Sequence, residues 1–124
     1  MKLFVYGTLQ RGYGNHIRLR NAEFISTGVS VKPYVLFNCG FPLAVPFTEN
    51  EETHPLLPIT GELFKVTKAE LESCDRLERH PSWYKRTTIQ INTDNGIVDA
   101  MIYEMPSWSK NRLSPVVDSK YRWS

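Results

Sequence analysis

The chain has 124 residues, of which 41% are hydrophobic and 23% charged, and its formal net charge is +2. This size suits one globular domain with a single hydrophobic core, so we expect residues 1–124 to fold as one unit. The basic residues are scattered along the chain instead of forming a dense stripe, which argues against nucleic-acid binding.

The first part of the chain alternates short apolar runs with glycine-rich turns. Residues 2–6 are typical of a buried strand, and residues 7–14 contain three glycines and predict a loop. We expect one or two helical turns over 15–21. Residues 24–31 are rich in β-branched and aromatic side chains, which predicts a strand with a bulge at Gly28.

Two further strands are predicted after Pro33, over 34–37 and 41–45. Segment 48–58 is acidic and carries two prolines, so we expect an exposed loop. Strand character returns over 61–66, immediately before the one helix that the sequence signals strongly.

That helix begins after Thr67, a good N-cap, and Glu70 three residues later completes a capping box. It must end before Pro81, because proline cannot continue a helix. Its apolar residues fall on one stripe, which predicts a single buried face: Leu71, Cys74 and Leu77.

The rest of the chain predicts a β-hairpin. Apolar and polar residues alternate over 84–92, Asn95–Gly96 is a favoured turn pair, and 97–105 returns. No periodicity is visible from Pro106 onward. Strands therefore outnumber helices, which predicts an α+β fold with a largely antiparallel or mixed sheet that can curl into a barrel. A doubly wound Rossmann sheet would need more helices between its strands.

Nucleotide and metal motifs are incomplete. Gly7–Gly12 has the spacing of a Walker A loop, but Tyr13–Gly14 stands where lysine and serine or threonine are required. The Rossmann glycine pattern fails at Ile17. We expect no metal site, because the candidate ligands lack the close spacing of zinc sites: His16, His54, His80, Cys39 and Cys74.

The cysteines and the N-terminus bear on location. Cys39 and Cys74 can pair only once and belong to no close-spaced framework, which favours free thiols in a reducing compartment. The apolar run after Met1–Lys2 stops at Gly7, too early for a membrane span or a secretion signal. We therefore expect a cytoplasmic protein without a membrane partner. The sequence gives no indication of oligomeric state.

The turn after the first strand has two interpretations. It can be an ordinary turn, or the backbone N–H groups of Gly7, Thr8 and Leu9 can converge on a carboxylate. On the second interpretation, Gly7→Val should abolish binding and leave the fold largely intact. Six aromatic residues could line a pocket, although ordinary packing is the simpler role for each: Trp83, Tyr84, Tyr103, Trp108, Tyr121 and Trp123.

Glu78 is the acidic residue with the strongest local signal. It can be a solvated charge at a helix end, or a general base. A carboxylate in the last helical turn faces the negative end of the helix dipole, and Asp75 adds a like charge on the same face. Both effects raise a carboxyl pKa toward the range that suits a general base, whereas Arg76 and Arg79 act in the opposite direction, so the residues alone leave the direction of the net shift open.

Together these segments resemble the γ-glutamylcyclotransferase family, and in particular its AIG2-like branch, which includes γ-glutamylamine cyclotransferase. The resemblance rests on Val5-Tyr6-Gly7-Thr8-Leu9, Arg11-Gly12, Asn15-His16, Asp75-x-Leu77-Glu78 and Tyr84-x-Arg86, in this order along most of the chain. It implies a small mixed β-barrel with flanking helices. Arg79 departs from the small residue that often follows the glutamate in the family, which bears on the preferred leaving group.

The resemblance also implies a reaction and a site. Tyr6, Gly7, Thr8 and Leu9 correspond to the substrate-binding turn, and Glu78 to the catalytic glutamate. The substrate would be a small γ-glutamyl compound whose own α-amine attacks the γ-carbonyl, releasing 5-oxoproline and an amine or amino acid. No cofactor is implied.

Two other classes of function stay open at this point. The chain could be a non-catalytic module that binds small carboxylates, or a hydrolase or acyltransferase that uses the same glutamate on another amide. Glu78 and the complete turn argue against the first class, and nothing in the sequence excludes the second.

Overall fold

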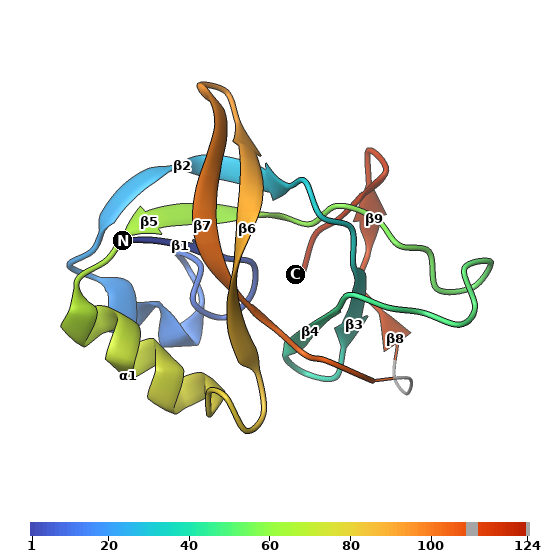
Figure 1. The fold of residues 1–124 in the computed structure, drawn as a ribbon, viewed down its shortest axis with the longest axis horizontal. Helices are drawn as coiled ribbons and strands as arrows, with labels where there is room; N and C mark the ends of the chain where they lie inside the picture. The colour runs from blue at the N-terminus through green and yellow to red at the C-terminus, as the bar shows by residue number, and fades with distance from the viewer. Residues whose placement is uncertain (109–111, 124) are drawn as a thin grey trace.

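Five strands close into a barrel in the computed structural model, which describes residues 1–108 and 112–123 (Figure 1). Neighbouring strands are antiparallel except where β1 meets β7 in parallel, with Leu3 opposite Met101. The prediction of an α+β fold with a small mixed barrel is therefore confirmed. In barrel order the strands are β1 (Lys2–Val5), β5 (Thr60–Lys65), β2 (Glu23–Ser30), β6 (Lys85–Thr93) and β7 (Gly96–Glu104).

The predicted bulge in β2 is at the wrong residue. The register of β2 against β5 shifts between Phe24 and Ser26, so Ile25 is the extra residue and not Gly28. Gly28 has a different role, because a Cβ atom there would lie 2.6 Å from Cγ2 of Ile91. The glycine allows Ile91 of β6 to lie close to the backbone of β2. This contact cannot be predicted from the sequence of β2 alone.

A second, smaller sheet lies beside the barrel. It contains β4 (Pro42–Val45), β3 (Val35–Asn38) and β8 (Arg112–Leu113), in that order, and β9 (Val116–Val117) pairs with β10 (Lys120–Tyr121). The strands predicted at 34–37 and 41–45 are thus confirmed within a residue. Strands of two residues are too short to show periodicity, which explains why the part after Pro106 gave no signal.

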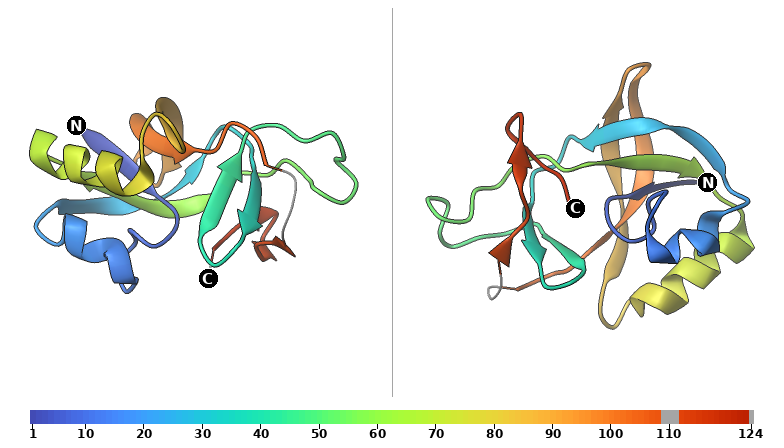
Figure 2. Two further views of the ribbon diagram at one scale, coloured as in Figure 1. Left: turned by 90° about the horizontal axis from the view of Figure 1, so that it is seen from below. Right: turned by 180° about the vertical axis from the view of Figure 1, so that it is seen from behind.

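Two helical segments lie at the end of the molecule away from the small sheet (Figures 1 and 2). The expected helical turns over 15–21 are a 3-10 helix, η1 (Gly14–Leu19), and the strong helix is α1 (Lys68–Glu78). The capping box is formed: the Glu70 amide donates to Thr67 Oγ1 over 3.2 Å, and the Thr67 amide to Glu70 Oε1 over 2.8 Å.

The core has two halves, separated by β1. Its alternate side chains point to opposite faces, so Leu3 and Val5 pack with Leu71 under α1, whereas Phe4 packs in the second half with Ile91. Loop 48–58 is exposed as predicted over residues 49–53, but its last residues are half-buried. In the described part of the chain, no helix is long and apolar enough to cross a membrane.

Candidate active site

A cleft of about 230 Å³ opens where β1 ends, beside the last turn of α1. All five residues singled out in the sequence line it: Tyr6, Gly7, Thr8, Leu9 and Glu78. The remaining walls come from β4, from the segment after α1 and from β7, so segments distant in sequence enclose the predicted turn.

The turn after β1 is fixed through its carbonyl groups. The Gln10 amide donates to the Gly7 carbonyl over 3.0 Å, and the Asn15 amide to the Thr8 carbonyl over 3.1 Å. Asn15 Nδ2 also donates to Thr8 Oγ1 over 2.9 Å, and His16 Nδ1 lies 2.9 Å from the Leu9 carbonyl. These contacts tie the turn to η1 and hold its backbone in one orientation.

The N–H groups of this turn differ from its carbonyl groups in their hydrogen bonding. Within residues 1–108 and 112–123, the amides of Gly7, Thr8 and Leu9 donate no hydrogen bond. Gly7 and Leu9 are buried and Thr8 is half-buried. Successive unpaired amides at a cleft wall favour an anion, since buried donors gain most from an acceptor.

Glu78 is the last residue of α1, and burial raises the pKa of its carboxyl group to about 7, although Arg18 acts to lower it. The sequence alone left the direction of this shift open, and burial decides it. Arg18 on η1 is the opposing charge, in place of Arg76 and Arg79. No described residue donates a hydrogen bond to the Glu78 side chain, so its orientation depends on the position of α1.

Asp75 does not act as the free like charge that the sequence suggested. Burial acts to raise its pKa, but hydrogen bonds from Arg86 and Tyr103 outweigh burial and lower it. The carboxylate of Asp75 is thus occupied by these two donors. Asp75 and Glu78, three residues apart on this helix, therefore have pKa values shifted in opposite directions.

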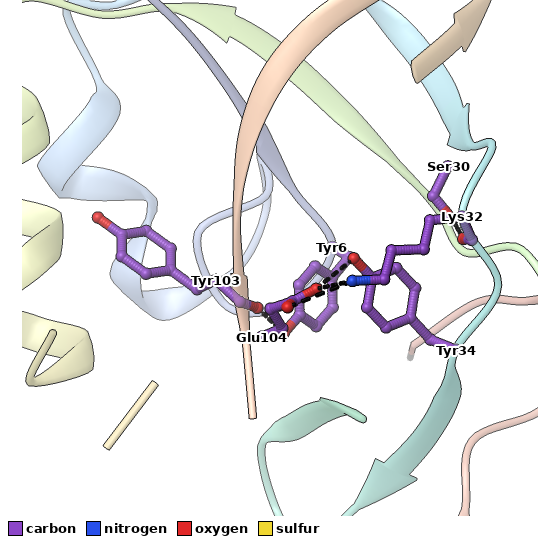
Figure 3. A network of polar contacts seen from close by, with 6 residues as sticks. All are labelled: Tyr6, Ser30, Lys32, Tyr34, Tyr103 and Glu104. Atoms are coloured by element: carbon purple, nitrogen blue, oxygen red, sulfur yellow. Dashed lines mark hydrogen bonds and ion pairs between the residues drawn. The ribbon is translucent and has the colours of Figure 1, made fainter. Parts of the chain in front are cut away.

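Two phenols in the cleft wall are bound to backbone carbonyls. Tyr6 donates to the Tyr103 carbonyl over 2.6 Å, and Tyr84 donates to the Pro42 carbonyl. Figure 3 shows the first contact, with the Tyr103 side chain pointing away from Glu104. Burial raises the pKa of both phenols, so they stay neutral and serve as fixed walls.

Sequence reasoning missed several residues of the cleft. Trp83, Tyr84 and Tyr103 belong to the aromatic set that could have lined a pocket, but the other three members do not line this cleft. Trp108 borders a different cavity, and Tyr121 and Trp123 pack in the core. Val5, Asn15 and Leu77 stand within the motifs quoted from the sequence but were not assigned to the site, and no local pattern pointed to the other missed residues: Phe4, Phe41 and Pro42.

The described residues contain no group of three or more His, Cys, Asp or Glu side chains placed to hold a metal ion. The cleft is lined by one carboxyl group with a pKa of about 7 and by three residues whose amides donate no hydrogen bond within the described part of the chain. Such a pair can bind a small carboxylate and transfer protons beside it.

Comparison with known proteins relates nearly the whole chain to one family. Residues 3–124 match the family described as gamma-glutamyl cyclotransferase, AIG2-like. A proposed γ-glutamylcyclotransferase of Methanocaldococcus jannaschii is 35% identical, with 84% of this chain and 83% of that protein covered. Gamma-glutamylaminecyclotransferase C of Danio rerio is 32% identical, with 96% and 84% covered.

The fold agrees as well. The crystal structure of an AIG2-like protein from Mus musculus superimposes with a TM-score of 0.73 at 28% identity, covering 87% of this chain and 78% of that one. The fold of this chain is thus a known architecture. The chain belongs to the gamma-glutamyl cyclotransferase, AIG2-like family.

Proposed function

We propose that the protein is a γ-glutamyl cyclotransferase that converts a γ-glutamyl amine or γ-glutamyl amino acid into 5-oxoproline and the free amine or amino acid. Relatives at 32–35% identity carry names of this family. The observation that carries the proposal is Glu78, a carboxyl group with a pKa of about 7 in the same cleft as the unpaired amides of Gly7, Thr8 and Leu9.

The two parts have separate tasks. The amides of Gly7 to Leu9 hold the α-carboxylate of the substrate, and this fixes one end of a short flexible molecule. Folding the substrate then brings its α-amine next to its γ-carbonyl carbon, so that the attack is intramolecular. Such positioning can supply about 7 kcal/mol or more of the barrier.

Glu78 then transfers the protons. The α-ammonium group gives one proton to the Glu78 carboxylate, and the free amine attacks the γ-carbonyl carbon to form a tetrahedral intermediate. As the γ-amide C–N bond breaks, Glu78 gives its proton to the leaving nitrogen. The restored carboxylate then takes the second proton of the attacking nitrogen and passes it to the released amine, which departs as an ammonium ion. A base with a pKa near 7 suits this exchange, because it can both accept and return a proton at neutral pH.

We place this chemistry in the γ-glutamyl metabolism of the cytoplasm. Cys39 and Cys74 are free thiols, which suits a reducing compartment.

The test is release of 5-oxoproline from a panel of γ-glutamyl compounds that differ in the leaving group. Glu78→Gln keeps the size of the side chain but cannot accept a proton, so turnover should fall by about 10² to 10⁴. Affinity for 5-oxoproline, measured by calorimetry, should stay within about threefold. Glu72→Gln on the exposed side of α1 is the matched control and should behave as wild type.

Each alternative has its own outcome. Release of glutamate without 5-oxoproline would indicate a hydrolase that uses the same carboxyl group. Binding of 5-oxoproline without turnover of any compound would indicate a binding module. Full turnover by Glu78→Gln would remove Glu78 from the mechanism.

A further inference from the structure

Asp75 receives three hydrogen bonds from two strands of the barrel. Arg86 donates from Nε to Oδ1 over 2.9 Å and from a terminal nitrogen to Oδ2 over 3.1 Å. Tyr103 donates its phenol proton to Oδ1 over 2.6 Å. A forked arginine contact with a carboxylate is a strong and directional ion pair.

The two donors are placed by the hairpin itself. Arg86 on β6 and Tyr103 on β7 are directly opposite each other in the antiparallel register. Side chains opposite each other in a hairpin lie on the same face of the sheet. The hairpin therefore presents both donors to one carboxylate on α1, and the side chains of Asp75 and Arg86 are only 20% and 25% exposed.

Tyr103 and Arg86 also make backbone contacts to the two sides of the cleft. The Tyr103 carbonyl accepts the Tyr6 phenol, which comes directly before the turn at Gly7. The Arg86 amide donates to Nδ1 of His80, just beyond the end of α1, and the His80 amide donates to the Asp75 carbonyl. Contacts thus run from the turn through β7 and β6 to the last turn of the helix.

Glu78 lies one helical turn after Asp75 and has no hydrogen bond from a described residue to orient its side chain. Its distance from the turn is therefore set by where the end of α1 lies. Of the residues in that end, Asp75 is the one held by side chains of the barrel wall.

We propose that Asp75, held by Arg86 and Tyr103, is a positioning residue that fixes Glu78 relative to the amides of Gly7 to Leu9. This inference rests on the proposed cyclotransferase function. Asp75 does not touch the substrate and takes no proton. It acts by locking α1 onto the β6–β7 hairpin, because near-attack geometry is lost with small displacements of a catalytic group.

The test is Asp75→Asn, which keeps the shape of the side chain but loses its charge and one acceptor. Because a misplacement of about 1 Å can cost about 10² in rate, we expect kcat to fall by about 10- to 100-fold. KM and the affinity for 5-oxoproline should change by less than about threefold, since the turn that holds the carboxylate is intact. Circular dichroism at the assay temperature checks that the variant is folded.

Tyr103→Phe is the milder second variant, because it removes one donor and keeps the ring and the carbonyl that binds Tyr6. If both residues act through one link, the double variant should lose little more kcat than Asp75→Asn alone. Glu72→Gln on the same helix serves as the control for charge.

Wild-type kcat in folded Asp75→Asn would overturn the inference and leave the proposed function standing, as would additive losses in the double variant. An equal loss of 5-oxoproline affinity would also overturn it, because the damage would then lie in the turn. If the wild-type protein releases no 5-oxoproline from any compound, it is the proposed function that fails.

Discussion

A Cβ atom on Gly7 would lie 2.2 Å from Cγ of Pro42, so the first turn of the chain and strand β4 touch through a glycine that has no room for a side chain. Gly7 does not have a positive φ, so the requirement comes from this close approach and not from backbone conformation. Any side chain at position 7 must displace Pro42, whose carbonyl binds Tyr84.

Gly7→Ala is therefore expected to weaken both the fold and the site. Forced contacts in a packed region cost about 1–3 kcal/mol in unfolding free energy, and 5-oxoproline affinity should drop at least about tenfold. Thermal melting and calorimetry measure the two effects. The expectation from sequence that valine would spare the fold does not agree with this contact.

The control for Gly7→Ala is Gly14→Ala, because no atom lies within 4 Å of a Cβ there and its φ is not positive. It should bind 5-oxoproline as the wild type does. Wild-type affinity in Gly7→Ala would mean that the ligand does not contact this turn.

The pH dependence of turnover should follow Glu78. Its pKa is raised to about 7 by burial, so kcat/KM should rise with pH and level off above about pH 7. Initial rates of 5-oxoproline release between pH 5 and 9 measure this limb. An acidic limb near pH 4.5, the ordinary value, would show that another group carries the proton.

The same group gives a stability prediction of definite sign. Because the folded-state pKa lies above the unfolded value of about 4.5, the folded state binds more protons between pH 4.5 and 7. The stability due to Glu78 is thus present below pH 4.5 and is lost as the pH rises to about 7. Glu78→Gln should raise the melting temperature relative to wild type more at pH 8 than at pH 5.

Tyr34 and Lys32 provide a contrast between a buried and a partly exposed contact. Tyr34 donates its phenol proton to Glu104 Oε2 over 2.6 Å, and Lys32 Nζ lies 3.0 Å from the same oxygen (Figure 3). Tyr34→Phe should cost about 1.5–3 kcal/mol, as for hydrogen bonds to charged groups.

Lys32→Met should cost no more than about 1 kcal/mol, because the Lys32 side chain is 40% exposed and water screens its charge. Urea unfolding of both variants measures the difference. Equal losses would contradict this contrast, because the exposed ion pair would then contribute as much as the phenol.

The two thiols should differ in reactivity. Cys74 is fully buried on the inner face of α1, and burial raises its pKa to about 12, whereas Cys39 is half-buried. Iodoacetamide at pH 8 should label Cys39 in the folded protein and both residues in urea. Labelling of Cys74 without denaturant would show that the helix end opens.

A separate expectation concerns additives. Enzyme activity should survive both a thiol reductant and a metal chelator.

Much of the fold could be predicted because its signals are local. The capping box at Thr67, the hairpin turn and the alternation of β6 each lie within a few residues, although the turn residues are Asp94 and Asn95, one position before the predicted pair, and Gly96 already pairs with Thr93. The pattern of β1 and its turn was equally local, and all five predicted site residues do line one cleft.

What could not be predicted depends on contacts between distant segments. Pro42 and Tyr103 line the cleft only because the small sheet and β7 fold against the turn. Likewise, the helix dipole and the charges near Glu78 in the sequence left the direction of its pKa shift open, whereas burial raises the pKa and Arg18 is the opposing charge. Asp75 is neutralised by Arg86, which lies 11 residues further on.

The parallel contact of β1 with β7 has a consequence for the order of folding. Tyr6 and Tyr103, joined by one hydrogen bond across this closure, are 97 residues apart in the sequence. During synthesis, β1 must therefore wait for β7, the last barrel strand in the chain, before the cleft has its full wall. Contacts between residues this far apart in sequence slow folding, because the entropy of closing the long loop is lost before the contact stabilises the chain. A nascent chain without β7 would thus contain the turn and Glu78 but lack the frame that sets them against each other.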